Sequence, residues 1–248
     1  MGKVFVVLKT KIMKIIIIFY LLISHQCLSQ MFGGQIVRLT PEQLYAPNSI
    51  WCPAPTTIVE VTNPYTSRIW MDRNLGASQV AISTTDPLAY GDLYQWGRRS
   101  DGHQCRNSPV TYTLSSTDVP AHGSFIVSPS PPNDWRSPQN SNLWQGVSGI
   151  NNPCPKDFRL PTQAEFQSER ISWNNYVWPG YFNSPLKFTL GGDRVDASGN
   201  LNMTGTSGLY WTSTTNQTFA YYLYFNNSSN SLTPDDRAFA CSVRCIKD

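Results

Sequence analysis

The sequence predicts an α+β domain of short antiparallel strands with few helices and long irregular loops. Three observations support this class. Strand-like segments follow one another closely, as they do in antiparallel hairpins rather than in βαβ units. One segment near residue 162 carries a clear helix start. Residues 100–155 hold eight prolines, which exclude long regular structure there.

The chain begins with a lysine-dotted segment and a nine-residue apolar run over residues 15–23. This run is shorter than the roughly 20 residues that span a bilayer, and it is typical of the apolar core of a secretory signal peptide. Small side chains at Cys27 and Ser29 suit signal peptidase, so we expect residues 1–29 to be removed. Lipidation of Cys27, which the bulky Gln26 disfavours, and an uncleaved anchor are the alternatives.

The apparent basicity of the chain comes from this leader. The 248 residues carry a net charge of +3, and residues 1–29 hold four lysines and no acidic residue, so cleavage would leave a net charge of −1. We therefore expect no nucleic-acid partner. Eight Trp, twelve Tyr and eleven Phe supply apolar surface for a core and argue against disorder. No second spanning stretch follows, so we expect no membrane span after signal cleavage, and a secreted or cell-envelope location.

The domain is expected to begin after an N-terminal tether. Residues 30–54 carry few strong signals, and the domain is predicted over residues 55–248. Residues 57–62 alternate and are rich in β-branched side chains. Residues 67–72 give a second strand after a turn, so the two segments predict a hairpin. The proline-rich residues 100–155 are predicted as one long loop region.

The helix start lies at Thr162, a natural N-cap, with Glu165 three residues later. This spacing predicts a capping box, in which each side chain satisfies a backbone donor of the other residue. Phe166 and Trp173 would then lie on one side of the helix. The rest of the chain predicts strands, which cover residues 210–213, 219–225 and 237–246.

Export permits disulfide bonds. Cleavage leaves five cysteines, an odd number, so at least one is unpaired or bonded to another chain. Cys241 and Cys245 lie in one predicted strand, where about 3.3 Å per residue separates them by roughly 13 Å, beyond the roughly 7 Å limit for a disulfide. Each therefore has a distant partner or stays reduced. The remaining cysteines are Cys52, Cys105 and Cys154.

Catalytic and metal-binding motifs are weak. Asp101, His103 and Cys105, joined by His122, suggest a zinc site, but such residues serve more often as polar loop side chains. His122 also lies close to Ser124, without the nucleophile elbow of a hydrolase. We expect no cofactor from these residues.

Acidic residues concentrate in two turns. Asp193 and Asp196 lie near glycines, and Asp235 and Asp236 follow Pro234. Such carboxylates can hold a structural calcium ion or act as a glycosidase pair, although turn formation is their more common role. A structural calcium ion therefore stays an open alternative.

The predicted strand at residues 219–225 is strongly aromatic. One face carries Phe219, Tyr221, Leu223 and Phe225 and is expected to enter the core. The other face carries Tyr222 and Tyr224, which are candidate binding residues because they could stack on sugars or on a partner protein. Burial with bonded hydroxyl groups is the alternative role of these two tyrosines.

Several segments match one family in order. They are IWMDRNLGA (69–77), AYGDLYQWGR (89–98), DWRSPQN (134–140), NPCP (152–155), FRLPT (158–162), YWTST (210–214) and SVRCIKD (242–248). Over about residues 55–248 the chain thus resembles the Fibrobacter succinogenes major paralogous domain family. The resemblance implies an exported protein of the kind found mostly in Bacteroidetes-type bacteria, without an established activity. It also implies a core similar to the C-type-lectin-like fold.

The same resemblance bears on the cysteines. Cys154 and Cys245 lie within two of the family segments, which favours a disulfide between them. Cys241 stands where the family is expected to have an aromatic residue. Residues 159–166 also resemble the formylglycine-generating enzymes, whose reactive cysteine pair differs in spacing from Cys241 and Cys245. The calcium-dependent sugar-binding motif of C-type lectins is not matched.

We therefore expect an exported, non-catalytic domain of the cell surface or envelope. It would serve adhesion or assembly through residues 100–155, with a glycan or a cell-surface protein as the partner. Trp135 and Trp144 are candidate contact residues in this loop, although pinning the loop to the core is the more common role of such tryptophans. Two alternatives remain, a carbohydrate-binding lectin-like protein and an oxidase related to formylglycine generation that uses Cys241 or Cys245.

Overall fold

The computed structural model divides the chain into two units, residues 1–41 and residues 42–248, each of which is described by itself. It describes residues 29–32, 35–38, 44–131, 133–173 and 178–248. Residues 1–28 of the predicted signal peptide, with Cys27, lie outside these ranges. In the first unit β1 (Ser29–Phe32) pairs with β2 (Gln35–Arg38) as an antiparallel hairpin, where the sequence predicts only a tether.

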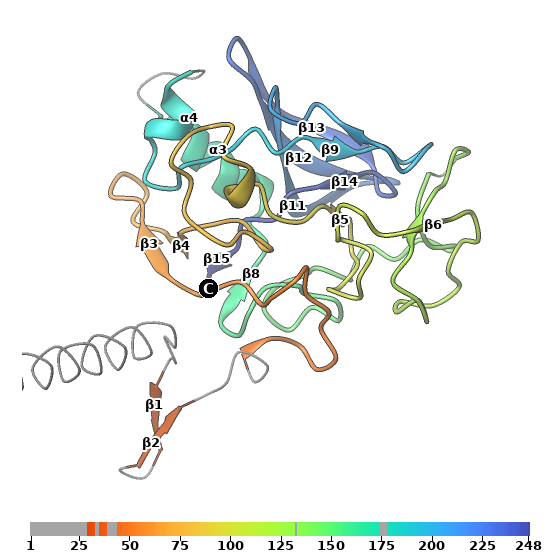
Figure 1. Ribbon diagram of the computed structural model, residues 1–248, viewed down its shortest axis with the longest axis horizontal. Coiled ribbons are helices and arrows are strands. Elements are labelled where there is room, and N and C mark those ends of the chain that lie inside the picture. The colour runs from red at the N-terminus through yellow and green to blue at the C-terminus, as the bar shows by residue number, and fades with distance from the viewer. Residues whose placement is uncertain (1–28, 33–34, 39–43, 132, 174–177) are drawn as a thin grey trace, which may run out of the picture. The chain divides into compact units, whose positions relative to one another are not determined.

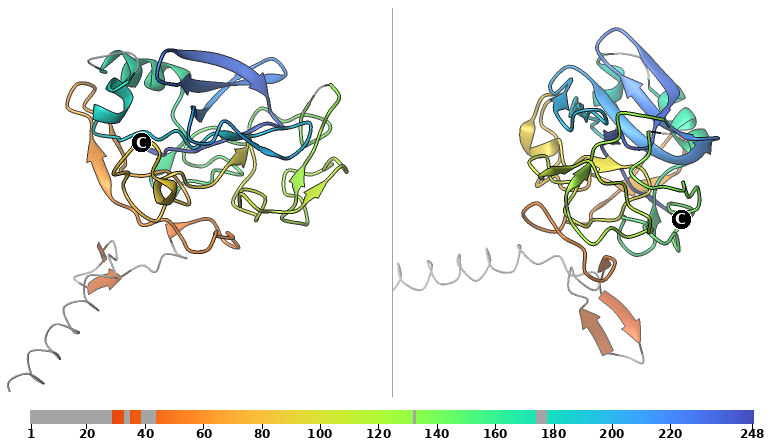
Figure 2. Two further views of the ribbon diagram at one scale, coloured as in Figure 1. Left: turned by 45° about the horizontal axis from the view of Figure 1, so that its top comes forward. Right: turned by 90° about the vertical axis from the view of Figure 1, so that its right-hand side faces the viewer.

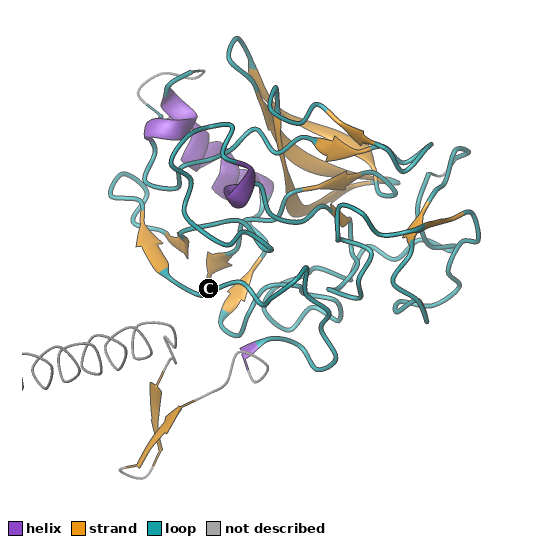
Figure 3. Ribbon diagram, viewed as in Figure 1, coloured by secondary structure: helices purple, strands orange, loops and turns teal. Residues whose placement is uncertain are grey.

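The second unit is built from short strands in small sheets, together with the helices α3 and α4 (Figures 1 and 3). Most neighbouring strands run antiparallel, which confirms the predicted α+β class. Within the described residues no helix is both long and apolar enough to cross a membrane.

The predicted N-terminal hairpin of this unit forms. It consists of β3 (Glu60–Thr62) and β4 (Ile69–Met71), which pair antiparallel. The last strand, β15 (Ile246–Lys247), lies beside β4, and β8 (Phe158–Arg159) completes the sheet in the order β3-β4-β15-β8. The start and the end of this unit are therefore joined through one sheet.

The prediction of a single strand over residues 237–246 is wrong, because the segment contributes to two separate strands. Its first half forms β14 (Ala240–Cys241), whereas its last residue begins β15 in the sheet just described. The segment cannot stay straight because its two halves pair in different sheets. The second sheet has the order β10-β9-β14-β5, with β5 (Tyr94–Gln95), β9 (Asp193–Arg194) and β10 (Leu201–Asn202).

A third sheet is a meander of three strands, β11 (Gly208–Asn216), β12 (Phe219–Phe225) and β13 (Asn230–Asp236). The bounds of β12 match the prediction. The sequence did not predict β13, because Pro234 and two aspartates are unusual in a strand. Proline is tolerated there since β13 is an edge strand of this sheet.

Helix α3 (Gln163–Ile171) begins with the predicted capping box. The Oγ1 atom of Thr162 accepts a hydrogen bond of 3.2 Å from the backbone N of Glu165, and the Glu165 carboxylate accepts one of 2.8 Å from the backbone N of Thr162. The helix packs against β11 and β12. The remaining helical elements are α4 (Gly180–Asn183) and the 3₁₀ helix η1 (Pro87–Ala89).

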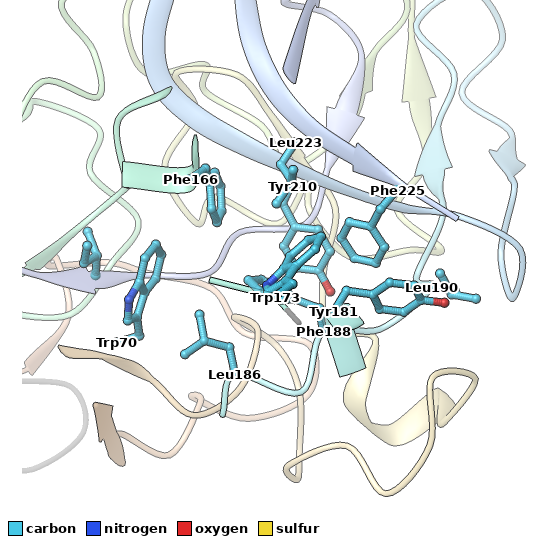
Figure 4. Close-up of a cluster of buried hydrophobic side chains, with 11 residues drawn as sticks. Trp70, Phe166, Trp173, Tyr181, Leu186, Phe188, Leu190, Tyr210, Leu223 and Phe225 are labelled. Atoms are coloured by element: carbon cyan, nitrogen blue, oxygen red, sulfur yellow. The ribbon is translucent and has the colours of Figure 1, made fainter. Parts of the chain in front are cut away.

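Phe166 and Trp173 enter the same aromatic core, as predicted, although Trp173 follows the end of α3 (Figure 4). The ring of Trp70 stacks on Phe166 with 5.5 Å between centroids. This cluster ties β4 and β15 to α3 and the meander. Its buried members are Trp70, Phe166, Trp173, Tyr181, Leu186, Phe188, Leu190, Tyr210, Leu223, Phe225 and Ile246.

The segment 100–155 is mostly irregular, as predicted, and Figures 1 and 2 show it at the opposite end of this unit from α4. Its regular elements are β6 (Val110–Thr111) and β7 (Phe125–Ile126), which pair in parallel.

Residues 44–54 belong to this second unit rather than to a tether. The hydroxyl of Tyr45 donates a hydrogen bond of 2.9 Å to the carbonyl of Thr56. The backbone N of Ile50 donates one of 2.7 Å to the carbonyl of Ser100. A disulfide between Cys52 and Cys105 adds a covalent link, so the packed structure begins before residue 55.

Candidate functional site

Two disulfides close this unit within the described residues. The predicted bond between Cys154 and Cys245 is present, with 5.9 Å between Cα atoms. The second bond joins Cys52 to Cys105, with 5.5 Å between Cα atoms. Disulfides indicate folding in an oxidising environment outside the cytoplasm.

Cys241 is a free cysteine. Its side chain is fully buried, and burial raises the pKa of its thiol well above the ordinary value. Because Cys245 is already bonded to Cys154, Cys241 and Cys245 do not form the reactive pair that the oxidase alternative requires.

Trp135 and Trp144 are buried, with 1% and 0% of their surface exposed. The indole N–H of Trp135 donates a hydrogen bond of 2.7 Å to the carbonyl of Trp96. That of Trp144 donates one of 3.0 Å to the carbonyl of Asn151. Their rings and N–H groups therefore fix the loop to the core, which is the structural role that the sequence offered beside ligand contact.

The two candidate tyrosines of β12, Tyr222 and Tyr224, also contact neighbouring residues. Tyr222 is buried and packs edge-to-face on Trp211, with 5.7 Å between ring centroids. Tyr224 is half-buried, and its hydroxyl accepts a hydrogen bond of 2.7 Å from the side chain of Asn226. Tyr222 therefore presents no open ring face for stacking, and the buried role is the observed one for it.

His103 has a structural role. Its Nδ1 lies 2.6 Å from the Asp101 carboxylate, and its Nε2 accepts a hydrogen bond of 3.0 Å from the backbone N of Gln95. Burial lowers the pKa of His103 to about 4, so the ring is neutral at pH 7. The guanidinium of Arg98 pairs with the same carboxylate at 2.8 Å. Both ring nitrogens of His103 are occupied and Cys105 is bonded to Cys52, so neither residue has a free ligand atom for zinc in this structure.

The acidic turns place their carboxyl groups in different surroundings. Within the described ranges, no group of three or more His, Cys, Asp or Glu side chains is arranged to hold a metal ion. Asp193 is buried, and burial raises its pKa to about 6. Its Oδ2 atom has no hydrogen-bond partner among the described residues, whereas Oδ1 lies 3.4 Å from the Asn202 side-chain nitrogen.

A cleft of about 690 Å³ lies beside the Cys52–Cys105 disulfide. We call it the Asp92 cleft. Its walls come from the turn after β4, from η1 and the residues that follow it, and from the loop after β10. The lining residues are Cys52, Pro53, Gly76, Ser78, Pro87, Leu88, Tyr90, Gly91, Asp92, Cys105, Arg106, Asn107, Leu201 and Thr204.

Among the residues that line this cleft, Asp92 has the largest shift in pKa. Its side chain is 6% exposed, and its carboxyl group accepts no hydrogen bond from the described part of the chain. Burial raises the pKa of Asp92 to about 8, an effect that the positive charge of Arg106 opposes. With this pKa the carboxyl group is mostly protonated at pH 7, and a protonated carboxyl group can donate a hydrogen bond.

Gly76 makes room for this carboxyl group. Its backbone has a φ of +81°, and a Cβ atom at this position would overlap the Asp92 carboxyl group. The Asp92 side chain is thus held directly against the backbone of the turn after β4.

Arg106 also lines the cleft, and hydrogen bonds fix its guanidinium. Its Nε donates a hydrogen bond of 2.7 Å to the carbonyl of Gly91, and its Nη2 donates one of 2.9 Å to the carbonyl of Gly191. The guanidinium lies over the ring of Tyr90, 5.5 Å from its centroid. Its Nη1 makes no hydrogen bond to the described residues, so this donor is open to a ligand.

A groove of about 640 Å³ lies between the turn after β3 and helix α3. Its two charged side chains, Arg68 and Glu165, form an ion pair of 3.2 Å with each other. Since the charges of this groove are already paired, the Asp92 cleft is the stronger candidate.

The sequence analysis did not single out Asp92 or Arg106. Asp92 lies within the AYGDLYQWGR segment, where a lone acid between aromatic residues was a usable signal for a buried carboxyl group. Arg106 lies in a loop, and its approach to Asp92 depends on the fold. Comparisons of the chain with protein-family models, with curated proteins and with solved structures give no match.

Proposed function

We propose that this protein is an exported, non-catalytic domain of the cell surface or envelope that binds a ligand in the Asp92 cleft, in the service of adhesion or assembly. The observation that carries this proposal is a buried carboxyl group without a hydrogen-bond partner in the described structure, in the same cleft as an arginine with an unused donor. Polar groups of this kind, in a cleft with apolar walls, are typical of ligand sites.

The lining of the cleft supports binding rather than catalysis. It contains no histidine, and its two cysteines are joined to each other in a disulfide. Among the described residues, the Asp92 carboxyl group has no hydroxyl or thiol within hydrogen-bond distance that it could activate as a nucleophile.

Membership of the Fibrobacter succinogenes major paralogous domain family, with a C-type-lectin-like core, is part of the same proposal. Its support is that the family-like segments meet in space. The SVRCIKD segment bonds to NPCP through Cys154–Cys245 and pairs with IWMDRNLGA through Ile246 and Trp70. Export through cleavage after residue 29 is supported by the two disulfides.

A ligand screen on purified residues 30–248 tests the proposal. We suggest ligand-observed NMR with neutral sugars, acidic sugars, small carboxylic acids and short peptides. The variant Leu201→Trp enlarges an exposed side chain in the cleft, and Leu114→Trp makes the same change at an exposed position outside it.

Hits that Leu201→Trp abolishes and Leu114→Trp preserves would support the proposal. A screen without hits, or hits that both variants bind equally, would contradict it.

A further inference from the structure

We infer that the Asp92 cleft selects small ligands that carry a carboxylate next to an apolar group. This inference rests on the ligand-binding function proposed above and names the class of ligand. Two features of the cleft carry it, the pair of donors formed by Asp92 and Arg106 and the exposed apolar side chains at the rim.

The donor pair favours an anion. Arg106 supplies a fixed positive charge, since two of its nitrogens are held by backbone carbonyls and one stays open. The charge of Arg106 acts to lower the pKa of Asp92, but the two side chains form no ion pair within 4.0 Å. A carboxylate placed between them would accept a hydrogen bond from the Arg106 guanidinium and another from the protonated Asp92.

A cation is disfavoured at the same place. An ammonium group would need an ionised Asp92, and ionisation is opposed by the burial of this carboxyl group. The ammonium would also lie next to the Arg106 guanidinium. With Asp92 neutral and Arg106 positively charged, this part of the cleft favours an anionic group over a cationic one.

The rim selects what the carboxylate is attached to. Leu88 is 57% exposed and Leu201 is 47% exposed, and both line the cleft together with Pro87. Covering these side chains with a hydrocarbon group contributes roughly 25 cal/mol per Å² of apolar area removed from water. An acid with a branched alkyl group fits this rim better than a hydroxylated sugar acid.

Isothermal titration calorimetry on residues 30–248 at pH 6.5 tests the ligand class with three probes. N-acetyl-leucine carries the carboxylate and the alkyl group, N-acetyl-leucinamide lacks the charge, and glucuronate lacks the alkyl group. We expect N-acetyl-leucine to bind at least tenfold more tightly than either control probe. Equal binding of the amide would overturn the anion assignment, and tighter binding of glucuronate would overturn the apolar one.

The pH dependence tests the donor role of Asp92. Arg106 and Tyr94 interact electrostatically with Asp92, and Tyr90 lines the same cleft. Burial raises the pKa of both tyrosines above 10. Between pH 6.5 and 9.5 the group that changes charge among these four is therefore Asp92, which becomes a carboxylate that repels the ligand.

We expect the affinity for N-acetyl-leucine to fall at least tenfold over this range in the wild type. It should stay constant in Asp92→Asn, which keeps a neutral donor. Arg106→Gln should lower the affinity for N-acetyl-leucine at least tenfold at pH 6.5. Arg68→Gln changes a half-exposed arginine outside the cleft and should bind as the wild type does.

A wild-type affinity that does not change with pH would overturn the role of Asp92. The proposed ligand-binding function can be separated from this inference. N-acetyl-leucine could fail to bind while another ligand binds the wild type and not Leu201→Trp. In that case the cleft is a binding site and the inferred ligand class is wrong.

Discussion

Arg244 donates two hydrogen bonds, of 3.0 and 2.8 Å, to the side-chain oxygen of Asn74, although 170 residues separate the two in the chain. Both side chains are buried. Asn74→Ala would leave donors of a buried guanidinium without a partner, so we expect a loss of about 3 kcal/mol in the free energy of unfolding. Urea denaturation measures it. The same substitution at the exposed Asn142 should change stability by less than about 0.5 kcal/mol, and an equal loss at both positions would contradict the prediction.

The Cys154–Cys245 disulfide closes a loop of 91 residues. The chain-entropy model gives a loss of roughly 4–5 kcal/mol in unfolding free energy when such a bond is removed. We expect Cys154→Ser and Cys245→Ser each to show a loss of this size in guanidinium denaturation. The free energy of unfolding of the double variant should be no lower than that of the less stable single variant. Additive losses would mean that the cysteines stabilise the fold separately.

The state of Cys241 can be counted chemically. Because Cys241 is buried and the other four cysteines of residues 30–248 are bonded, we expect no alkylation of the native protein by iodoacetamide. In denaturant without reductant, mass spectrometry should find one alkylated residue, at Cys241. Rapid alkylation of the native protein at Cys241 or Cys245 would revive the oxidase alternative.

Trp135 anchors the long loop. Its ring is buried, and the guanidinium of Arg98 lies 5.6 Å from the ring centroid. We expect Trp135→Ala to lower the free energy of unfolding by about 3–5 kcal/mol, as do other large-to-small core substitutions. Tyr112→Ala removes an exposed aromatic side chain of the same loop and should be nearly neutral. Thermal and urea denaturation of both variants would show the difference, and two neutral variants would mean that Trp135 does not hold the loop.

Asp92 makes stability depend on pH. Its pKa is raised to about 8 in the folded state from an ordinary value near 4. Between these values the folded state binds more protons than the unfolded state, so the Asp92 contribution to stability falls as pH rises. Asp92→Asn has no such dependence. We therefore expect the variant to gain stability relative to the wild type from pH 4.5 to 8.5, by on the order of a few kcal/mol.

Urea denaturation at pH 4.5, 6.5 and 8.5 measures this gain. Asp157→Asn, at an exposed aspartate, serves as the control for the loss of one acidic side chain. A difference between Asp92→Asn and the wild type that does not change with pH would place the Asp92 pKa near its ordinary value.

The elements that sequence predicts best are those with local causes. The start of α3 follows from Thr162 and Glu165, which contact each other within one helical turn. The strand β12 follows from an unbroken run of aromatic and β-forming residues. These features hold whatever the rest of the chain does, so the sequence suffices for them.

The errors have non-local causes. The strand β13 tolerates Pro234 because the sheet ends there, and the sequence does not show which strand lies at an edge. The predicted strand 237–246 divides because Cys241 and Ile246 pair with different sheets. The Asp92 cleft escaped prediction for the same reason. It brings together loops near residues 52, 76, 92, 106 and 201, which are close only in the folded chain.

The two disulfides enclose separate, non-overlapping stretches of chain, residues 52–105 and 154–245. Neither spans the proline-rich stretch between residues 106 and 153. A protease nick inside either ring leaves the fragments covalently tethered. A single nick between the rings gives two polypeptides that separate under denaturing, non-reducing conditions. After a cut between residues 106 and 153, the two parts of this unit are therefore held together by packing and strand pairing alone, and by no sulfur–sulfur bond.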